Sequence, residues 1–370
     1  MKKDMRWNKK QRLLILSGLL AIFLLSAGFI IARFFPELLP TRADDQSEAT
    51  MEIFAMDTYI TMTAYGKDAE IALTEAENKM AELERSWSVT NPESDIYAVN
   101  HSNGRPVNVS EETAALLLFT LRMARETGGA LEPTIYPVLT AWGFTTEENR
   151  VPTDAEITAL LENVGYERIR LEDTTVQLDK DMMLDLGAVG KGYAGDLATQ
   201  VLKENGITSA LLDLGGNIQV IGTKPDGSPW RLGLRDPFSD GTLGVMEISN
   251  QAVVTSGAYE RYFIGEDGTM YGHIIDPATG YPAESGLASA TVIADEGRLC
   301  DALSTSLYMM GTERAIEYWQ QHHDFEMILV TDNGEIYLTD DIADHFNLDS
   351  YHSNMTIHVI DVNSRIEKDQ

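Results

Sequence analysis

The chain has 370 residues, with 28 Lys or Arg against 58 Asp or Glu, and a formal net charge of −30. Such an acidic protein is repelled by a phosphate backbone, which excludes nucleic acid as a partner. The single cysteine, Cys300, has no disulfide partner and lies far from the N-terminus, so a lipid-modified N-terminal cysteine is excluded as well.

The first predicted element is an apolar segment, Leu13–Ile31, which contains no charge and follows a basic stretch. It is long enough to cross a bilayer and longer than the usual apolar core of a secretory signal. We expect residues 1–35 to form an N-terminal transmembrane or signal helix, and the length favours an uncleaved anchor. The basic flank would stay in the cytoplasm, which places the rest of the chain, with a net charge of about −36, outside the cell membrane.

The next residues, 36–47, are polar and contain proline, and predict a linker. We expect one domain over residues 48–350 and a C-terminal tail over 351–370. Spacing of apolar residues predicts helices at Ala69–Trp87, Glu111–Glu126, from Tyr193 onward, Asp301–Met310 and Thr312–His322. Strands are predicted at Ile53–Tyr65, Met182–Asp185, Ser209–Ile221, Trp230–Leu234, Leu243–Ser249, Ala252–Thr255, Ser289–Ala294 and Thr356–Val362. These irregular groups favour an α+β fold, with mixed or antiparallel sheets and packed helices, over a doubly wound sheet.

The segment Met182–Asp196 combines the acid Asp185 with a lysine and four glycines, and we expect a ligand site at a junction between a strand and a helix. A phosphate-binding P-loop is excluded because Lys191 is followed by Gly192 and not by Ser or Thr. The run from Gly190 to Gly195 does fit the dinucleotide pattern Gly-x-Gly-x-x-Gly, but that pattern alone is common by chance. The glycines would let the backbone approach another group closely.

Two further segments could carry chemistry. Asp301 and Thr305 are four residues apart, so a helix places both oxygen ligands on one face, where Mg²⁺ could bind beside a phosphate. The structural alternative is that Asp301 caps the helix and Thr305 bonds back to the carbonyl of residue 301. His273 lies beside a turn and is suited to accept a proton from a hydroxyl, although a histidine in a strand is more often a core residue.

Taken in order, these segments resemble the FAD:protein FMN transferases, the ApbE flavin transferase family. The segments that carry the resemblance are Met56–Thr58, Trp87–Ile96 with Asn100, Thr127–Thr134 with Pro137, Trp142–Phe144, Asp185–Tyr193, Leu214–Asn217, Trp230, Asp236–Pro237, Thr255–Tyr259, His273–Gly280 and Asp301–Thr305. The resemblance implies an ApbE-like α+β enzyme that cleaves FAD, attaches FMN to a threonine of a partner protein through a phosphoester, and releases AMP. It also implies Mg²⁺, a site outside the cytoplasmic membrane, and acceptors such as subunits of Rnf or Nqr-type redox complexes or flavin-binding reductase domains.

The resemblance also implies residue roles. By position, the FAD contacts would be Met56, Thr90, Ala130, Leu131, Glu132, Asp185, Lys191 and His273. The metal ligands would be the backbone carbonyl of Ala188 and the side chains of Asp301 and Thr305. His273 would be the base, Lys191 would neutralise developing phosphate charge, and Asp301 would act through the metal.

The chain departs from the family at three positions. Leu131 and Glu132 stand where the family usually has Phe and Asp, and Thr90 stands where it often has Tyr. These changes bear on flavin affinity more than on the chemistry. Two other functions remain open: an Mg²⁺-dependent FAD pyrophosphatase that uses water in place of the protein hydroxyl, and a non-catalytic FAD-binding module.

Overall fold

The computed structural model describes residues 47–146 and 148–362, and the chain divides into two compact units, Met1–Ser47 and Glu48–Gln370. The helices and strands of the described residues all belong to the second unit. Among the described residues, no helix is both long enough and apolar enough to cross a membrane. The apolar segment Leu13–Ile31, predicted as the anchor, lies outside the described residues.

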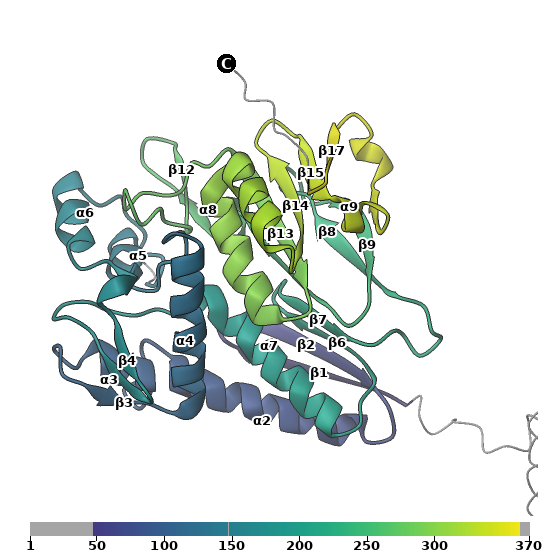
Figure 1. Ribbon diagram of the computed structural model, residues 1–370, viewed down its shortest axis with the longest axis horizontal. Coiled ribbons are helices and arrows are strands. Elements are labelled where there is room, and N and C mark those ends of the chain that lie inside the picture. The colour runs from purple at the N-terminus through teal and green to yellow at the C-terminus, as the bar shows by residue number, and fades with distance from the viewer. Residues whose placement is uncertain (1–46, 147, 363–370) are drawn as a thin grey trace, which may run out of the picture. The chain divides into compact units, whose positions relative to one another are not determined.

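The second unit is built on a nine-stranded sheet with the order β1-β2-β6-β7-β10-β13-β14-β15-β17 (Figure 1). Its strands are β1 (Glu48–Ala55), β2 (Thr58–Tyr65), β6 (Ser209–Leu214), β7 (Ile218–Ile221), β10 (Ala252–Ser256), β13 (Leu287–Ala294), β14 (Glu326–Thr331), β15 (Ile336–Thr339) and β17 (Ile357–Ile360). Neighbouring strands are antiparallel except β15 and β17, which are parallel. The sheet is therefore mixed, and the predicted α+β fold is confirmed.

The sheet is covered on both faces. Three helices, α2 (Ala69–Trp87), α7 (Gly187–Glu204) and α8 (Gly297–His322), pack on one face (Figure 1). The small sheet β16-β9-β8, formed by β16 (Phe346–Leu348), β9 (Thr242–Ile248) and β8 (Trp230–Arg235), shares a second core with the other face.

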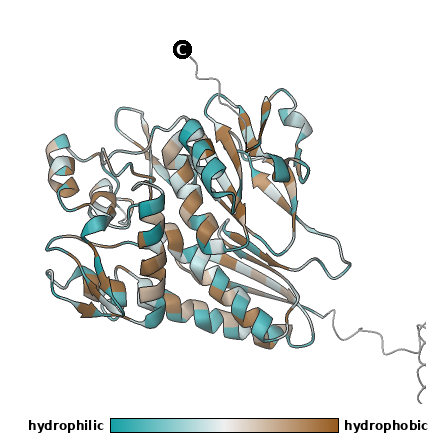
Figure 2. Ribbon diagram, viewed as in Figure 1, coloured by the Kyte–Doolittle hydropathy of each residue, from teal (hydrophilic) through white to brown (hydrophobic). Residues whose placement is uncertain are grey.

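Burial of both faces explains the sequence of the central strands. In β14, Met327 and Leu329 belong to the core beneath the helices, whereas Ile328 and Val330 belong to the core beneath the small sheet. A strand buried on both faces reads as a continuous apolar run and not as an alternating one. Figure 2 shows this run of hydrophobic residues in the central strands, beside helices that carry hydrophilic residues on their outer surfaces.

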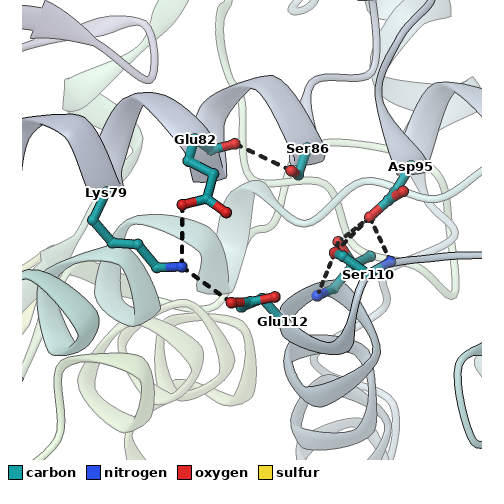
Figure 3. A network of polar contacts seen from close by, with 7 residues as sticks. Lys79, Glu82, Ser86, Asp95, Ser110 and Glu112 are labelled. Atoms are coloured by element: carbon teal, nitrogen blue, oxygen red, sulfur yellow. Dashed lines mark hydrogen bonds and ion pairs between the residues drawn. The ribbon is translucent and has the colours of Figure 1, made fainter.

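A lobe of short elements follows α2 in the chain. It contains α3 (Asp95–Asn100), α4 (Glu111–Glu126), α5 (Tyr136–Trp142), α6 (Asp154–Leu161) and a small sheet of β3 (Val107–Asn108), β5 (Thr175–Gln177) and β4 (Arg170–Glu172). Polar contacts join this lobe to α2 (Figure 3). Lys79 of α2 contacts Glu112 of α4 at 3.1 Å, and Asp95 accepts hydrogen bonds from both the amide and the hydroxyl of Ser110. These contacts fix the start of α4 against α2 and α3.

A two-stranded hairpin, β11 (Tyr262–Ile264) and β12 (Met270–Gly272), follows β10 in the chain. Phe263 and Tyr271 of the hairpin stack on each other and contact Trp142 of α5. The hairpin ends one residue before His273, so its packing on the lobe fixes the position of that histidine.

The structure corrects several predicted elements. Ile53–Tyr65 is not one strand, because residues 56 and 57 turn the chain between β1 and β2. Met182–Asp185 is not a strand, and the following helix begins at Gly187, six residues before Tyr193. Ser209–Ile221 contains two strands, β6 and β7.

Other predicted elements are confirmed. The helices at Ala69–Trp87 and Glu111–Glu126 have the predicted bounds. Helix α8 begins four residues before Asp301 and is interrupted at Gly311, whose φ of 76° is not helical, as the two separate predicted helices require. The strand predicted at Thr356–Val362 is present as β17.

Candidate functional site

The site is organised by a very close crossing of α7 and α8. A Cβ atom at Gly192 would lie 2.2 Å from the carbonyl oxygen of Gly297 and 2.7 Å from the Cβ atom of Asp301. Gln219 of β7 lies at the same crossing, where its Nε2 donates to the carbonyl oxygen of Gly192 at 2.9 Å. The glycines expected to permit a close approach do so, and their neighbours are a second helix and a sheet side chain.

Asp301 is buried at this crossing with 4% of its surface exposed. Its Oδ2 accepts the amide of Gly192 at 2.8 Å. In a regular helix that amide would donate to the carbonyl oxygen of Ala188, which we predicted as a metal ligand. The Asp301 carboxylate therefore competes with this carbonyl oxygen for the Gly192 amide. Burial raises the pKa of Asp301, and the nearby positive charge of Lys191 opposes the shift. A cation here would favour the ionised carboxylate and oppose this rise in pKa.

Thr305 lies one turn after Asp301 on the same face of α8, and its hydroxyl is within 3.2 Å of the Ser256 hydroxyl at the end of β10. Ser256 also contacts Ser304, which itself donates to the carbonyl oxygen of Asp301. The structural alternative for this pair is therefore wrong on two counts. Asp301 is the fifth residue of α8 and does not cap it. The back-bond to residue 301 comes from Ser304 in place of Thr305.

Asn217, in the turn between β6 and β7, adds a polar side chain that faces the same region. It is 1% exposed, and neither its Oδ1 nor its Nδ2 has a hydrogen-bond partner among the described residues. The amide is close enough to lower the pKa of Asp301, but its geometry falls short of a hydrogen bond. Buried polar side chains almost always have partners, so this one indicates a group that the protein alone does not supply.

Lys191 is the shared positive charge of the site. It lies on the first turns of α7, and its charge acts on Asp185, Glu260, His273 and Asp301. Burial raises the pKa of Asp185, whose Oδ1 accepts the amide of Gly187 at 2.7 Å. One cation thus faces acids from three different segments, an arrangement that suits an anionic ligand bound among them.

His273 has a defined tautomer. Its Nδ1 lies 3.1 Å from the carbonyl oxygen of Arg261. A carbonyl oxygen only accepts, so Nδ1 carries the proton and Nε2 is left with a free lone pair. Burial lowers the pKa of His273 to about 4, and the charges of Arg261 and Lys191 act in the same direction. The imidazole is therefore neutral near pH 7 and can accept a proton at Nε2.

Met56 occupies the turn between β1 and β2, where both Met56 and Asp57 have positive φ angles, 52° and 61°. The Met56 amide donates to the carboxylate of Glu84 at 2.8 Å, and Asp57 forms an ion pair with Arg261 at 2.7 Å. This ion pair joins the turn to the segment whose carbonyl orients His273.

The loop after α4 holds three of the predicted FAD contacts. The Leu131 side chain is buried in the main core, and its amide donates to the Thr127 hydroxyl at 3.2 Å. The Glu132 carboxylate accepts hydrogen bonds from the amide and hydroxyl of Thr134, at 2.9 and 2.6 Å, and from the amide of Tyr166, at 3.0 Å. These three hydrogen bonds occupy the Glu132 carboxylate and stabilise the loop. Ala130 is half-buried beside it.

This loop also fixes Asp185, because the Asp185 amide donates to the carbonyl oxygen of Pro133 at 2.8 Å. Thr90 is placed differently. It is exposed in the loop after α2, where its hydroxyl contacts Ser88 at 3.2 Å. Within the described part of the chain, no hydrogen bond joins Thr90 to the residues around Lys191.

The predicted site is thus brought together around Lys191, with Asp185, His273 and Asp301 acted on by its charge and Thr305 one helical turn away. Taken singly, the sequence segments Asp213–Asn217 and Thr255–Glu260 indicate no more than turns at strand ends. The structure gives site positions to Asn217, Ser256 and Glu260 from these segments. The local signal was a polar residue beside glycine at a strand end, which is too common to be specific.

Comparison with known proteins gives one consistent family. A family model described as the ApbE family matches residues 56–329. The chain is 34% identical over 258 residues to the FAD:protein FMN transferase of Klebsiella pneumoniae, covering 68% of this chain and 79% of that protein. It is 32% identical over 274 residues to the protein of the same name from Vibrio cholerae, covering 72% and 82%. The crystal structure of the ApbE protein from Thermotoga maritima superposes with a TM-score of 0.76 at 30% identity and covers 81% of this chain and 99% of that one.

Proposed function

The chain belongs to the ApbE family, and we propose that it transfers FMN from FAD to a threonine hydroxyl of a partner protein and releases AMP. The observation that carries the proposal is that three groups that phosphoryl transfer needs lie together. These are the ammonium group of Lys191, a basic nitrogen on His273, and the oxygens of Asp301 and Thr305, which could bind a cation.

The oxygen set fits a magnesium ion. Asp301, Thr305 and the Ala188 carbonyl are all hard oxygen donors, and Asn217 is a buried amide without a partner beside them. No group of three or more His, Cys, Asp or Glu side chains that could hold a metal occurs among the described residues. Mg²⁺ typically binds one or two carboxylates and completes its shell with water and substrate phosphates, so a single carboxylate is sufficient. When bound, the ion would neutralise charge on the pyrophosphate of FAD.

His273 would accept the proton of the acceptor threonine at Nε2. The threonine oxygen then bonds to the phosphorus of the FMN half, and the bond from that phosphorus to the bridging oxygen breaks. The bridging oxygen and its electron pair leave with AMP. The low pKa of His273 belongs to the protein without substrate, and the pyrophosphate anion would raise it by stabilising the imidazolium.

Lys191 would bind the pyrophosphate and stabilise the negative charge that develops on the leaving phosphate. Asp185, Met56 and the backbone of Ala130 and Leu131 would bind the rest of FAD. The Leu131 side chain is buried in the core, and the Glu132 carboxylate already has three donors. We therefore propose that Glu132 affects flavin binding by holding its loop in position, and that its carboxylate does not contact the flavin directly.

We extend the proposal to location and partners. The apolar segment Leu13–Ile31 after a basic stretch supports anchoring in the cell membrane with the catalytic domain outside. The acceptors would then be extracytoplasmic domains of membrane redox proteins, such as Rnf or Nqr-type subunits. A fusion of alkaline phosphatase after residue 47, which is active only outside the cytoplasm, should be active, and an inactive fusion would place the domain inside.

The test of the chemistry follows AMP and FMN by chromatography after the full chain, in detergent, is mixed with FAD and Mg²⁺. We expect cleavage to stop with EDTA, to return with added Mg²⁺, and to fall by orders of magnitude in Asp301→Ala. Release of free FMN without an acceptor would assign pyrophosphatase activity to the same residues. If FAD remains intact with every acceptor and cation tested, the protein would be a non-catalytic FAD-binding module.

A further inference from the structure

The Asn217 side chain is buried without a well-formed hydrogen bond to the described residues, although its amide lies close to the Asp301 carboxyl. It is 1% exposed, and both of its polar atoms lack a partner within the described residues. Its turn is held by other groups: the Leu214 amide donates to the backbone oxygen of Asn217 at 2.9 Å, and the Gly216 amide donates to Asp213 at 2.8 Å. Holding the turn therefore does not explain why a buried amide is present.

The register of β7 against α8 explains where this amide is aimed. Gln219, two residues later in the chain and so on the same side of the sheet, reaches the crossing at Gly192 and Gly297. Asp301 lies one helical turn after Gly297. Asn217 therefore faces Asp301 as Gln219 faces Gly297, and its amide is close enough to the Asp301 carboxyl to lower the pKa of that group.

We propose that the Oδ1 atom of Asn217 is a further ligand of the divalent cation at Asp301 and Thr305. This inference rests on the cation site of the proposed function. Together with the carbonyl oxygen of Ala188, it would bring the oxygen donors from the protein to four, and Mg²⁺ usually completes its shell with water and substrate phosphate oxygens.

The neutral charge of this ligand is part of the proposal. Asp301 would contribute the single negative charge among the four ligands, so the bound ion keeps a net positive charge toward the pyrophosphate. A second carboxylate at residue 217 would hold the ion more tightly in the free protein and leave it less attractive to the substrate.

The test measures Mn²⁺ binding, by the electron paramagnetic resonance signal of free Mn²⁺, to the full chain in detergent without FAD. Asn217→Leu has a similar volume and no polar atom. We expect its Kd for Mn²⁺ to rise at least tenfold, while its urea midpoint without metal stays equal to that of the wild type or increases. Asn217→Asp should lower the Kd for Mn²⁺.

Gln219→Met is the matched control on the same strand. Gln219 has a partner, so its loss should lower the urea midpoint while the Kd for Mn²⁺ changes less than twofold. Asp301→Ala is the reference for the site itself, and we expect it to abolish saturable Mn²⁺ binding.

Three results would count against the inference, and they are separable. Unchanged Mn²⁺ affinity in Asp301→Ala would remove the cation site of the proposed function and this inference with it. Loss of binding in Asp301→Ala with unchanged affinity in Asn217→Leu would overturn the role of Asn217 alone. If Asn217→Leu does not fold, Asn217→Asp decides, because an unchanged Kd there shows that the residue 217 oxygen does not touch the ion.

Discussion

The crossing of α7 and α8 should tolerate no side chain at Gly192. In Gly192→Ala the new Cβ would lie 2.2 Å from the Gly297 carbonyl oxygen, where ordinary contact begins at 3.4 Å. The two helices would have to separate by about 1.2 Å, and overpacking of this kind costs about 1–3 kcal/mol. The same separation breaks the hydrogen bond from the Gly192 amide to Asp301, which contributes about 1.5–3 kcal/mol because the acceptor is charged.

Against these costs, alanine gains about 1 kcal/mol of helix propensity over glycine. We therefore expect Gly192→Ala to lower the free energy of unfolding by about 1.5–5 kcal/mol, measured by urea denaturation without ligands, and to weaken Mn²⁺ binding through the displaced Asp301.

Gly190→Ala is the matched control, two residues earlier in the same helix. Its Cβ would meet only the Trp87 ring, at 3.9 Å, so the propensity gain should remain and raise stability by about 0.5–1 kcal/mol. We predict that the two substitutions change the free energy of unfolding in opposite directions. Equal stability of the two variants would refute the argument that the helices meet at Gly192.

Three further predictions concern His273 and Glu132. His273→Ala should lower the rate of FMN transfer by at least about 100-fold while FAD binding, followed by flavin fluorescence, changes little; transfer at the wild-type rate would remove His273 as the base. Because the folded pKa of His273 is about 4 and the unfolded value is 6.5, the unfolded chain binds the extra proton between these values, so His273 costs stability as the pH falls from 6.5 to 4. The stability of His273→Gln relative to wild type, from urea denaturation, should therefore rise over that range by up to about 3 kcal/mol, and a constant difference would contradict the low pKa. Glu132→Ala should lower the free energy of unfolding by about 2–4 kcal/mol because the Thr134 and Tyr166 donors lose their acceptor, and an unchanged urea midpoint would show that the brace is not needed.

The sequence predicted best where a single periodicity decides the structure. The helices at Ala69–Trp87 and Glu111–Glu126 have one buried stripe each, and the second begins at a Ser110 side chain that caps it. The turn at residues 56 and 57 was missed because Met and Asp there adopt positive φ without the Asn-Gly signal of a tight hairpin.

The apolar run Met182–Asp185 was mistaken for a strand because short buried runs do not reveal their hydrogen-bond partners. Two of its amides donate to single groups from distant segments: Leu184 donates to the Asn100 side chain at 2.6 Å, and Asp185 donates to the Pro133 carbonyl. Such pairings depend on the folded lobe and have no local pattern in the sequence.

Some residues of the candidate site could likewise be predicted from the sequence, and others could not. Asp301 and Thr305 could be paired from their spacing on one helix, and His273 and Lys191 could be named from the family resemblance. Asn217 could not be predicted as a metal ligand, because only the register of β7 against α8 brings it to Asp301. The same holds for the tautomer of His273, which depends on a carbonyl 12 residues earlier in the chain.

The central claim is the transfer of FMN to a protein, and intact-mass spectrometry tests it most directly. A threonine-containing acceptor domain would be incubated with the full chain in detergent, FAD and Mg²⁺, beside an acceptor with that threonine changed to alanine. We predict a mass gain of one FMN on the threonine-bearing acceptor only, with an equal amount of AMP, and no gain with Asp301→Ala. Cleavage of FAD into free FMN and AMP with no mass gain on any acceptor would contradict the account.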